Sequence, residues 1–205
     1  MWYWIIFGIV FFAAFAMTVR EGLWSNTILL FNLLISGVAA FAFYSPLTVM
    51  LDEKLKGEYT YVLDFVCIWA LFVGSMIVLG VLTGMASKTR MRFRHPIDSV
   101  GGPIVGLIVA WTLSGMVLAT LHTAPMPGKE EAFGGAFNYG PGEVDSASPL
   151  TTPDIGWLRL VESVTQPSAL GRSGMKGFSA SAFVTIYGNH REQFSKAPGI
   201  TVRRG

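Results

Sequence analysis

The chain has 205 residues, of which 52% are hydrophobic and only 14% are charged. Because soluble domains carry about 25% charged residues, this composition argues against a water-soluble protein. The formal net charge of +2 is too small to indicate nucleic-acid binding, and the single cysteine, Cys67, excludes an intrachain disulfide. We therefore expect the lipid bilayer as the main partner, and no nucleic acid.

Three long apolar stretches occupy the first 86 residues, and each predicts a membrane helix. They run from 2 to 19, from about 27 to 44 and from about 61 to 85. Ala14-Phe15-Ala16 resembles a signal-peptide cleavage site, but no Lys or Arg precedes the first stretch, so we expect a retained helix. Pro46 is predicted to end the second helix, and residues 47–58 are predicted to form a short helix at the membrane surface.

A few polar residues lie within or near these stretches. Asn32 is costly to leave facing lipid and should point at another helix, whereas Asp64 lies one turn inside the third stretch, near the interface. Two interpretations stay open. Either these groups make local hydrogen bonds, or they form a polar path across the bilayer together with Thr112 and Ser114.

The densest positive cluster of the chain follows the third stretch. It consists of Lys88, Arg90, Arg92 and Arg94. Short loops rich in Lys and Arg stay in the cytoplasm, so this cluster predicts the topology. The N-terminus and everything after residue 121 are then extracytoplasmic, and Arg20 lies in a cytoplasmic turn.

A fourth apolar stretch, residues 98–121, has small residues at four-residue spacing on one helical face. They are Gly102, Gly106, Ala110 and Ser114. Small residues let membrane helices approach closely, so this face predicts a packing seam. Gly80 and Gly84 form a G-x-x-x-G pattern in the third stretch and are predicted to pack helices in the same way. Asp98 is predicted to cap the fourth helix.

Residues 122–205 have the Gly- and Pro-rich composition of a loop or linker. Within them, Thr152-Pro153-Asp154 predicts the start of an amphipathic helix over about 154–166, and residues 183–187 predict a possible strand. Two short elements bury little apolar surface. We therefore expect an all-α fold with four membrane helices in residues 1–121. A partly ordered extramembrane tail is expected to rest on these helices or on a partner.

No residue pattern in the sequence points to catalysis. Nucleotide-binding and zinc-protease motifs are absent, and the three histidines, His95, His122 and His190, lack the spacing of metal ligands. Each histidine is expected at a membrane edge or on a surface. We expect no enzyme activity, no cofactor and no metal ion.

At Asp98-Ser-Val-Gly-Gly102-Pro-Ile-Val-Gly106 the sequence resembles the CvpA (colicin V production protein) family. The last membrane helix of that family opens with D-x-x-x-G-x-x-x-G, which Asp98, Gly102 and Gly106 match in register. The family usually continues with an Arg-Gly pair, for which this chain has Val109 and Ala110.

Arg20 and Gly22 are similar to an Arg-Gly turn in the first hairpin of the same family. The resemblance covers residues 1 to about 121. It implies an integral inner-membrane protein linked to toxin production or export and to envelope physiology, which we interpret as a non-enzymatic membrane scaffold. Two alternatives stay open: a transport or channel component, and a membrane tether for an extracytoplasmic partner. A homo-oligomer or an envelope protein is the expected protein partner.

Overall fold

The computed structural model describes residues 2–55, 60–87, 97–124, 137–140, 142–166 and 177–196. The helices in this part of the chain are α1 (Trp2–Thr18), α2 (Leu23–Leu55), α3 (Thr60–Ala86), α4 (Ile97–Leu121), α5 (Glu143–Ser146), α6 (Pro153–Thr165) and α7 (Ala180–Lys196). The described residues contain no strand. The predicted all-α class is therefore confirmed for them.

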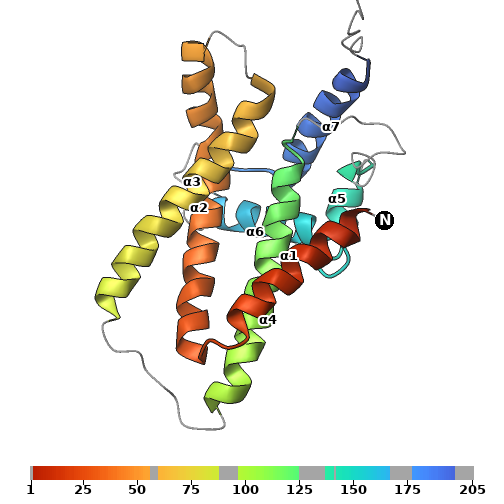
Figure 1. Ribbon diagram of the computed structural model, residues 1–205. Coiled ribbons are helices and arrows are strands. Elements are labelled where there is room, and N and C mark those ends of the chain that lie inside the picture. Colours follow the sequence, from red (N-terminus) through yellow and green to blue (C-terminus); the bar gives the residue numbers. More distant parts are fainter. Residues whose placement is uncertain are drawn as a thin grey trace, which may run out of the picture.

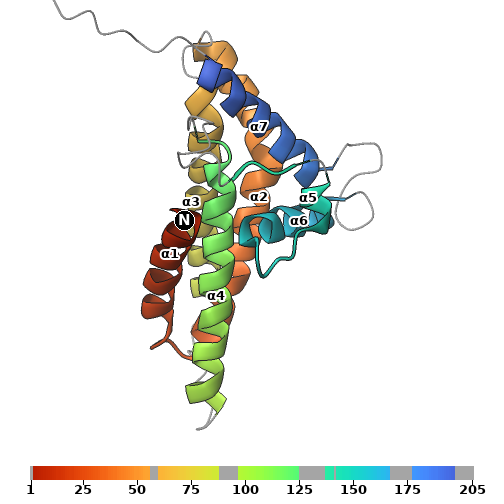
Figure 2. The ribbon, with the colours of Figure 1, turned by 90° about the vertical axis from the view of Figure 1, so that its right-hand side faces the viewer.

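The four long N-terminal helices run alternately in opposite directions (Figure 1). α2 packs against both α3 and α4, and α4 packs against both α1 and α2. These two helices therefore form the centre of the bundle. The short turn between α1 and α2 lies at one end of α4, and the tail helices lie towards its other end (Figures 1 and 2).

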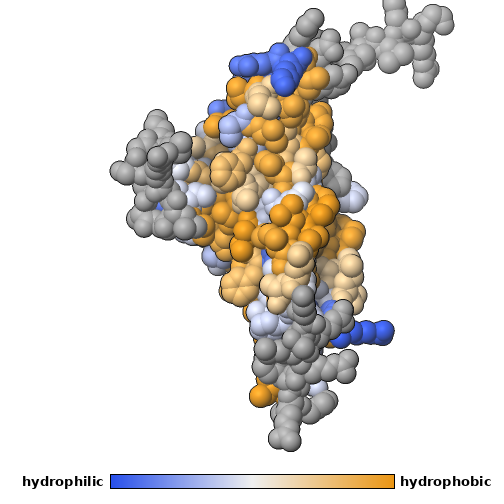
Figure 3. Space-filling view, turned by 90° about the vertical axis from the view of Figure 1, so that its left-hand side faces the viewer, coloured by the Kyte–Doolittle hydropathy of each residue, from blue (hydrophilic) through white to orange (hydrophobic). Residues whose placement is uncertain are grey.

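Three of these helices, α2, α3 and α4, are long and apolar enough to cross a membrane. α1 is equally apolar but has only 17 residues, a length of about 25 Å against a hydrocarbon core of about 30 Å. By length, then, the helices supply three membrane spans and not clearly the four that were predicted. All four expose large apolar side chains, and Figure 3 shows such side chains covering much of one face. Lipid would solvate this surface.

The second helix does not end at Pro46, as predicted, but continues through it to Leu55. A proline inside a helix removes one backbone hydrogen bond, and packing on both sides offsets that loss here. Phe41 before it and Thr48 after it are both buried. Up to residue 55, the predicted surface helix over 47–58 is thus the last part of α2.

The tail helix α6 lies against α2 and α4 (Figure 2), and it coincides with the helix predicted over 154–166. Two glycines make this contact possible. A Cβ atom on Gly37 would lie 2.4 Å from the ring of Trp157, and one on Gly115 would lie 2.6 Å from the carbonyl oxygen of Pro153. Of the two expected supports for the tail, the bundle or a partner, α6 therefore uses the bundle.

The predicted strand at residues 183–187 is wrong, because these residues form the middle of α7. Phe183, Val184 and Tyr187 are buried, while Thr185 and Ile186 are exposed. This pattern fits one face of a helix and not the alternation of a strand. The aromatic and β-branched composition favoured a strand locally, but burial against the bundle decides the structure.

Candidate functional site

Asp98 holds the turn between α1 and α2. Its carboxylate accepts a hydrogen bond of 2.8 Å from the backbone N–H of Leu23, the first residue of α2. Gly22 lies beside it, since a Cβ atom there would be 3.0 Å from the Asp98 oxygen. Asp98 therefore caps α2 across the turn and not its own helix, and its charge complements the positive end of the α2 dipole.

The two motif glycines of α4 lie directly under the same turn. A Cβ atom on Gly102 would be 2.7 Å from the carbonyl oxygen of Glu21, and one on Gly106 would be 3.0 Å from the hydroxyl of Thr18. The fully buried Asn26 donates to the carbonyls of Thr18 (3.0 Å) and Gly102 (2.8 Å). Side chains on these glycines would push the turn away from α4.

We call this contact the motif seam; it consists of Thr18, Gly22, Asn26, Asp98, Gly102 and Gly106. Arg20, which the resemblance also singled out, is exposed in the turn. The basic residues Lys88, Arg90, Arg92 and Arg94 lie outside the described residues. Of the predicted family-motif residues, the structure thus brings Asp98, Gly22 and the two glycines together.

The remaining small residues of α4 face the interior. Ala110 and Ser114 are fully buried, and the Ser114 hydroxyl donates to the Ala110 carbonyl at 2.7 Å. Thr112 donates to the carbonyl four residues before it, that of Ile108, at 2.8 Å. The hydroxyls of Thr112 and Ser114 therefore bond to their own helix.

Gly80 and Gly84 do not contact another described helix. A Cβ atom on either would meet no atom within 4 Å. The prediction that they pack helices together does not hold within the described part of the chain. The reason is that α3 packs on α2 through another face, which includes Ile68 and Phe72.

The two other candidates for a polar path bond locally and far from each other. Asn32 on α2 donates to the hydroxyl of Thr83 on α3 at 3.1 Å. Asp64, near the opposite end of α3, accepts a hydrogen bond of 2.7 Å from the hydroxyl of Tyr187. The positions 64 and 83 are about 28 Å apart along a helix. The structure therefore does not bring Asn32 and Asp64 to one site.

A second polar cluster joins the tail to α1 and α4. The carboxylate of Asp154 accepts three hydrogen bonds, from the Tyr3 hydroxyl (2.6 Å), the Tyr139 hydroxyl (2.8 Å) and His122 Nε2 (2.9 Å). Asp154 is 0% exposed and His122 is 1% exposed. The start of α1, the end of α4 and the start of α6 thus meet at one buried carboxylate.

The hydrogen bonds set the charge states in this cluster. Burial lowers the pKa of His122, which keeps the imidazole neutral, and its Nδ1 has no hydrogen-bond partner within the described ranges. A neutral ring with its proton on Nε2 fits both facts. Burial alone would raise the pKa of Asp154, but hydrogen bonds from His122, Tyr3 and Tyr139 outweigh it, so the pKa is lowered. The carboxylate is therefore ionised.

Arg191 of α7 completes the cluster. Its guanidinium donates to the carbonyls of His122 (3.1 Å) and Phe137 (2.8 Å) and to the side-chain oxygen of Asn138 (3.4 Å). The side chain is only 2% exposed, and burial lowers its pKa. We call the five residues Tyr3, His122, Tyr139, Asp154 and Arg191 the tail network.

The tail network holds elements together but offers no visible route to catalysis. Asp154 and His122 resemble part of a nucleophilic triad, yet both are closed off from solvent and no described nucleophile bonds to His122. In the same described residues, no three His, Cys, Asp or Glu side chains gather to hold a metal ion. The arrangement is that of a structural tie.

The sequence did not point to the tail network. His122 was expected at a membrane edge or surface, but it is buried, because the tail covers it. One available signal was Asp154, an acidic residue beside Ile155 in the apolar stripe of a predicted helix, since a buried carboxylate needs donors. The most distant donor, Tyr3, lies 151 positions away. No local pattern connects the two.

Comparison with known proteins links the chain to one family. A family model described as "Colicin V production protein" matches residues 4–141, which is more than half of the chain. No curated protein and no solved structure matches it. The matched residues include the whole motif seam, whereas α5, α6 and α7 lie beyond them.

Proposed function

Since the chain belongs to the Colicin V production protein family, we propose that it is a non-enzymatic scaffold of the bacterial inner membrane that serves toxin production or export. Its protein partners in this proposal are a second copy of the chain or an envelope protein. The membrane assignment has independent support from the three long apolar helices and their exposed apolar side chains.

One observation favours a scaffold over a transport component. A solute pathway requires polar side chains that converge on one water-filled route across the bilayer. Asn32, Asp64, Thr112 and Ser114 instead each bond to a nearby partner, and two of them bond only to carbonyls of their own helix. Local pairing is what a sealed bundle needs.

We propose α1 as the fourth crossing, with both the N-terminus and the tail on the extracytoplasmic side. The hydrogen bond from Tyr3 to Asp154 supports this arrangement, because it holds the start of the chain beside the tail. The motif seam would then lie near the cytoplasmic side, where the sequence places the basic residues 88–94 between α3 and α4.

Cysteine accessibility tests both the sealed scaffold and the proposed orientation in the membrane. Single cysteines at positions 20, 32, 114 and 148 are introduced on a Cys67→Ala background and treated with a water-soluble, membrane-impermeant thiol reagent. Arg20 and Ser148 are both exposed. We expect Ser148→Cys to react in intact spheroplasts and Arg20→Cys to react only after the membrane is opened.

The positions inside the bundle decide the function. We expect Asn32→Cys and Ser114→Cys to stay unlabelled from both sides, because neither position meets water in a sealed bundle. Rapid labelling of both would instead support the transport component. Labelling of Arg20→Cys in intact spheroplasts would reverse the proposed orientation.

A further inference from the structure

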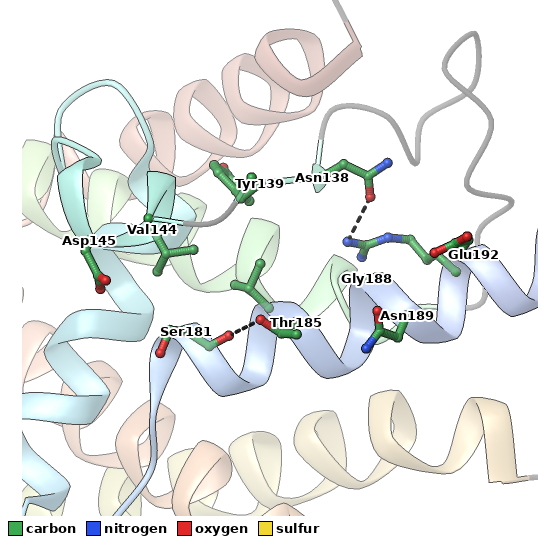
Figure 4. A pocket seen from close by; sticks show the side chains of 13 residues that line it. Asn138, Tyr139, Val144, Asp145, Ser181, Thr185, Gly188, Asn189 and Glu192 are labelled. Atoms are coloured by element: carbon green, nitrogen blue, oxygen red, sulfur yellow. Dashed lines mark hydrogen bonds between the residues drawn. The ribbon is translucent and has the colours of Figure 1, made fainter.

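A cavity of about 560 Å³ lies between α5, α7 and residues 138–140 (Figure 4). Its volume is within the range of small-molecule sites, about 300–1,000 Å³. Asn138, Thr185 and Asn189 contribute polar groups to its walls, and Figure 4 shows the last two on one side of α7. This lining suits a polar solute.

Arg191 lines this cavity and brings a buried positive charge to it. Each acceptor that it finds in the described part of the chain is an uncharged oxygen: two backbone carbonyls and the amide of Asn138 (dashed line in Figure 4). Its Nε has no hydrogen-bond partner there. A buried cation whose described acceptors are all neutral oxygens favours an anionic group nearby.

The cavity also presents negative charge. Asp145 of α5 and Glu192 of α7 both line it, and both are exposed, so the wall carries both signs of charge. A simple anion would be repelled by these carboxylates, and a simple cation by Arg191. A molecule that carries both charges satisfies both parts of the wall.

We propose that the cavity binds a small zwitterion, with its acidic group at Arg191 and its ammonium group towards Asp145. Two sources share this chemistry: a free amino acid or short peptide, and the headgroup of a zwitterionic phospholipid. The second source is within reach because the network residue His122, to which Arg191 donates, directly follows the apolar helix α4. This ligand site goes beyond the scaffold role and does not depend on it.

Isothermal titration calorimetry of the detergent-solubilised full chain tests the proposal. The two zwitterionic probes are glycylglycine and glycerophosphoethanolamine, a phosphodiester with one negative charge. The single-charge controls are N-acetylglycylglycine, which lacks the ammonium, and glycylglycinamide, which lacks the carboxylate. We expect at least one zwitterion to bind saturably and the single-charge controls to bind at least ten-fold more weakly.

The same titrations identify the source. Tighter binding of glycylglycine indicates a free solute, and tighter binding of glycerophosphoethanolamine indicates a lipid headgroup; either result supports the site. No binding of either zwitterion would overturn the proposal. Equal binding of glycylglycine and either of its single-charge controls would overturn it as well.

A pair of neighbouring substitutions locates the binding. Thr185→Trp fills the cavity from an exposed position of α7, whereas Ile186→Trp changes the next residue, which is 50% exposed and does not line the cavity. We expect at least a ten-fold loss of affinity in the first variant and less than a two-fold change in the second. Undiminished binding to Thr185→Trp would show that the ligand lies elsewhere.

A second variant tests the charge assignment without touching the buried network. Asp145 is exposed, so Asp145→Asn should fold normally. We expect it to weaken zwitterion binding several-fold and to leave the weak binding of N-acetylglycylglycine unchanged or slightly stronger. Unchanged zwitterion affinity in this variant would contradict the proposed position of the ammonium group.

Discussion

At one end of α4, two glycines let the α1–α2 turn lie on the helix backbone, whereas at the other end three side chains donate hydrogen bonds to a buried carboxylate. The motif seam depends on the absence of side chains at its glycines, together with the cap from Asp98 and the hydrogen bonds of Asn26. The tail network depends on specific donors and on a particular charge state. The first should fail when atoms are added, and the second when a donor, an acceptor or a proton is changed.

The largest effect should come from one added methyl group in the motif seam. Gly102→Ala places a Cβ atom 2.7 Å from a backbone oxygen that cannot rotate away. We expect a loss of about 3 kcal/mol in the free energy of unfolding, the upper end of the usual range for overpacking. Equilibrium unfolding in mixed micelles with increasing SDS measures it.

Gly84→Ala is the matched control for this substitution. It makes the same chemical change on a membrane helix, at a position where the added Cβ atom would meet no described atom within 4 Å. Alanine favours helix over glycine, so its stability should be unchanged or slightly raised. Equal destabilisation by both substitutions would show that the close approach at Gly102 does not matter.

The next effect should come from removing the charge at the centre of the tail network. Asp154→Asn keeps the shape but replaces one acceptor oxygen with an N–H₂ group that faces hydroxyl and imidazole donors. We expect about 2 kcal/mol of destabilisation and faster proteolysis of the tail, because hydrogen bonds to a buried charge are lost. Asp145→Asn, on the exposed tail surface, should change neither. A tail that stays protected in Asp154→Asn would contradict this role.

Of the motif seam and the tail network, we expect only the tail network to lose stability in mild acid. Burial lowers the pKa of His122 below its ordinary 6.5, so the unfolded chain takes up this proton first as the pH falls. Stability should therefore be full above pH 6.5 and fall below it by up to about 1.4 kcal/mol per pH unit. The pKa of Asp154 is also lowered, so the stability that its ionised carboxylate contributes is lost only at still lower pH.

Two histidine variants assign this pH dependence. His122→Gln should remove the slope between pH 6.5 and 5, whereas His190→Gln, at an exposed position of α7, should keep it. Unfolding curves at a series of pH values give the slope directly. If His122→Gln kept the full slope, another group would be responsible.

The smallest effect should come from the polar contact between α2 and α3, which belongs to neither end. Asn32→Leu removes the 3.1 Å hydrogen bond to Thr83, and interhelical hydrogen bonds in membranes average about 0.6 kcal/mol. A double-mutant cycle with Thr83→Val isolates this coupling. A coupling of 2 kcal/mol or more would mean that the middle of the bundle relies on polar contacts as much as the tail does.

The motif seam was partly visible in the sequence because regular spacing along one helix records which face must stay small. Gly102 and Gly106 follow that rule. Their partners, Thr18 and Asn26, had no signal, because they come from another segment. The same spacing also predicted helix packing at Gly80 and Gly84, where no described helix of this chain lies opposite. Spacing alone does not distinguish the two cases.

The tail was harder to read for a physical reason. Its helices are stabilised by contacts with the bundle, and such contacts override local preference. The run 183–187 favoured a strand by composition, yet Val184 and Tyr187 are buried on one helical face. Likewise, the bundle and not the local sequence decides that α2 passes through Pro46.

The seating of Trp157 against Gly37 has a consequence for biosynthesis. The chain leaves the ribosome from its N-terminus, and Trp157 lies 42 positions after Gly115, the later of the two glycines that contact α6. At a synthesis rate of about 5–20 residues per second, Trp157 is therefore made roughly two to eight seconds after Gly115. Until then no tail helix covers Gly37 and Gly115, so we expect a chain truncated before α6 to be degraded faster than the full chain.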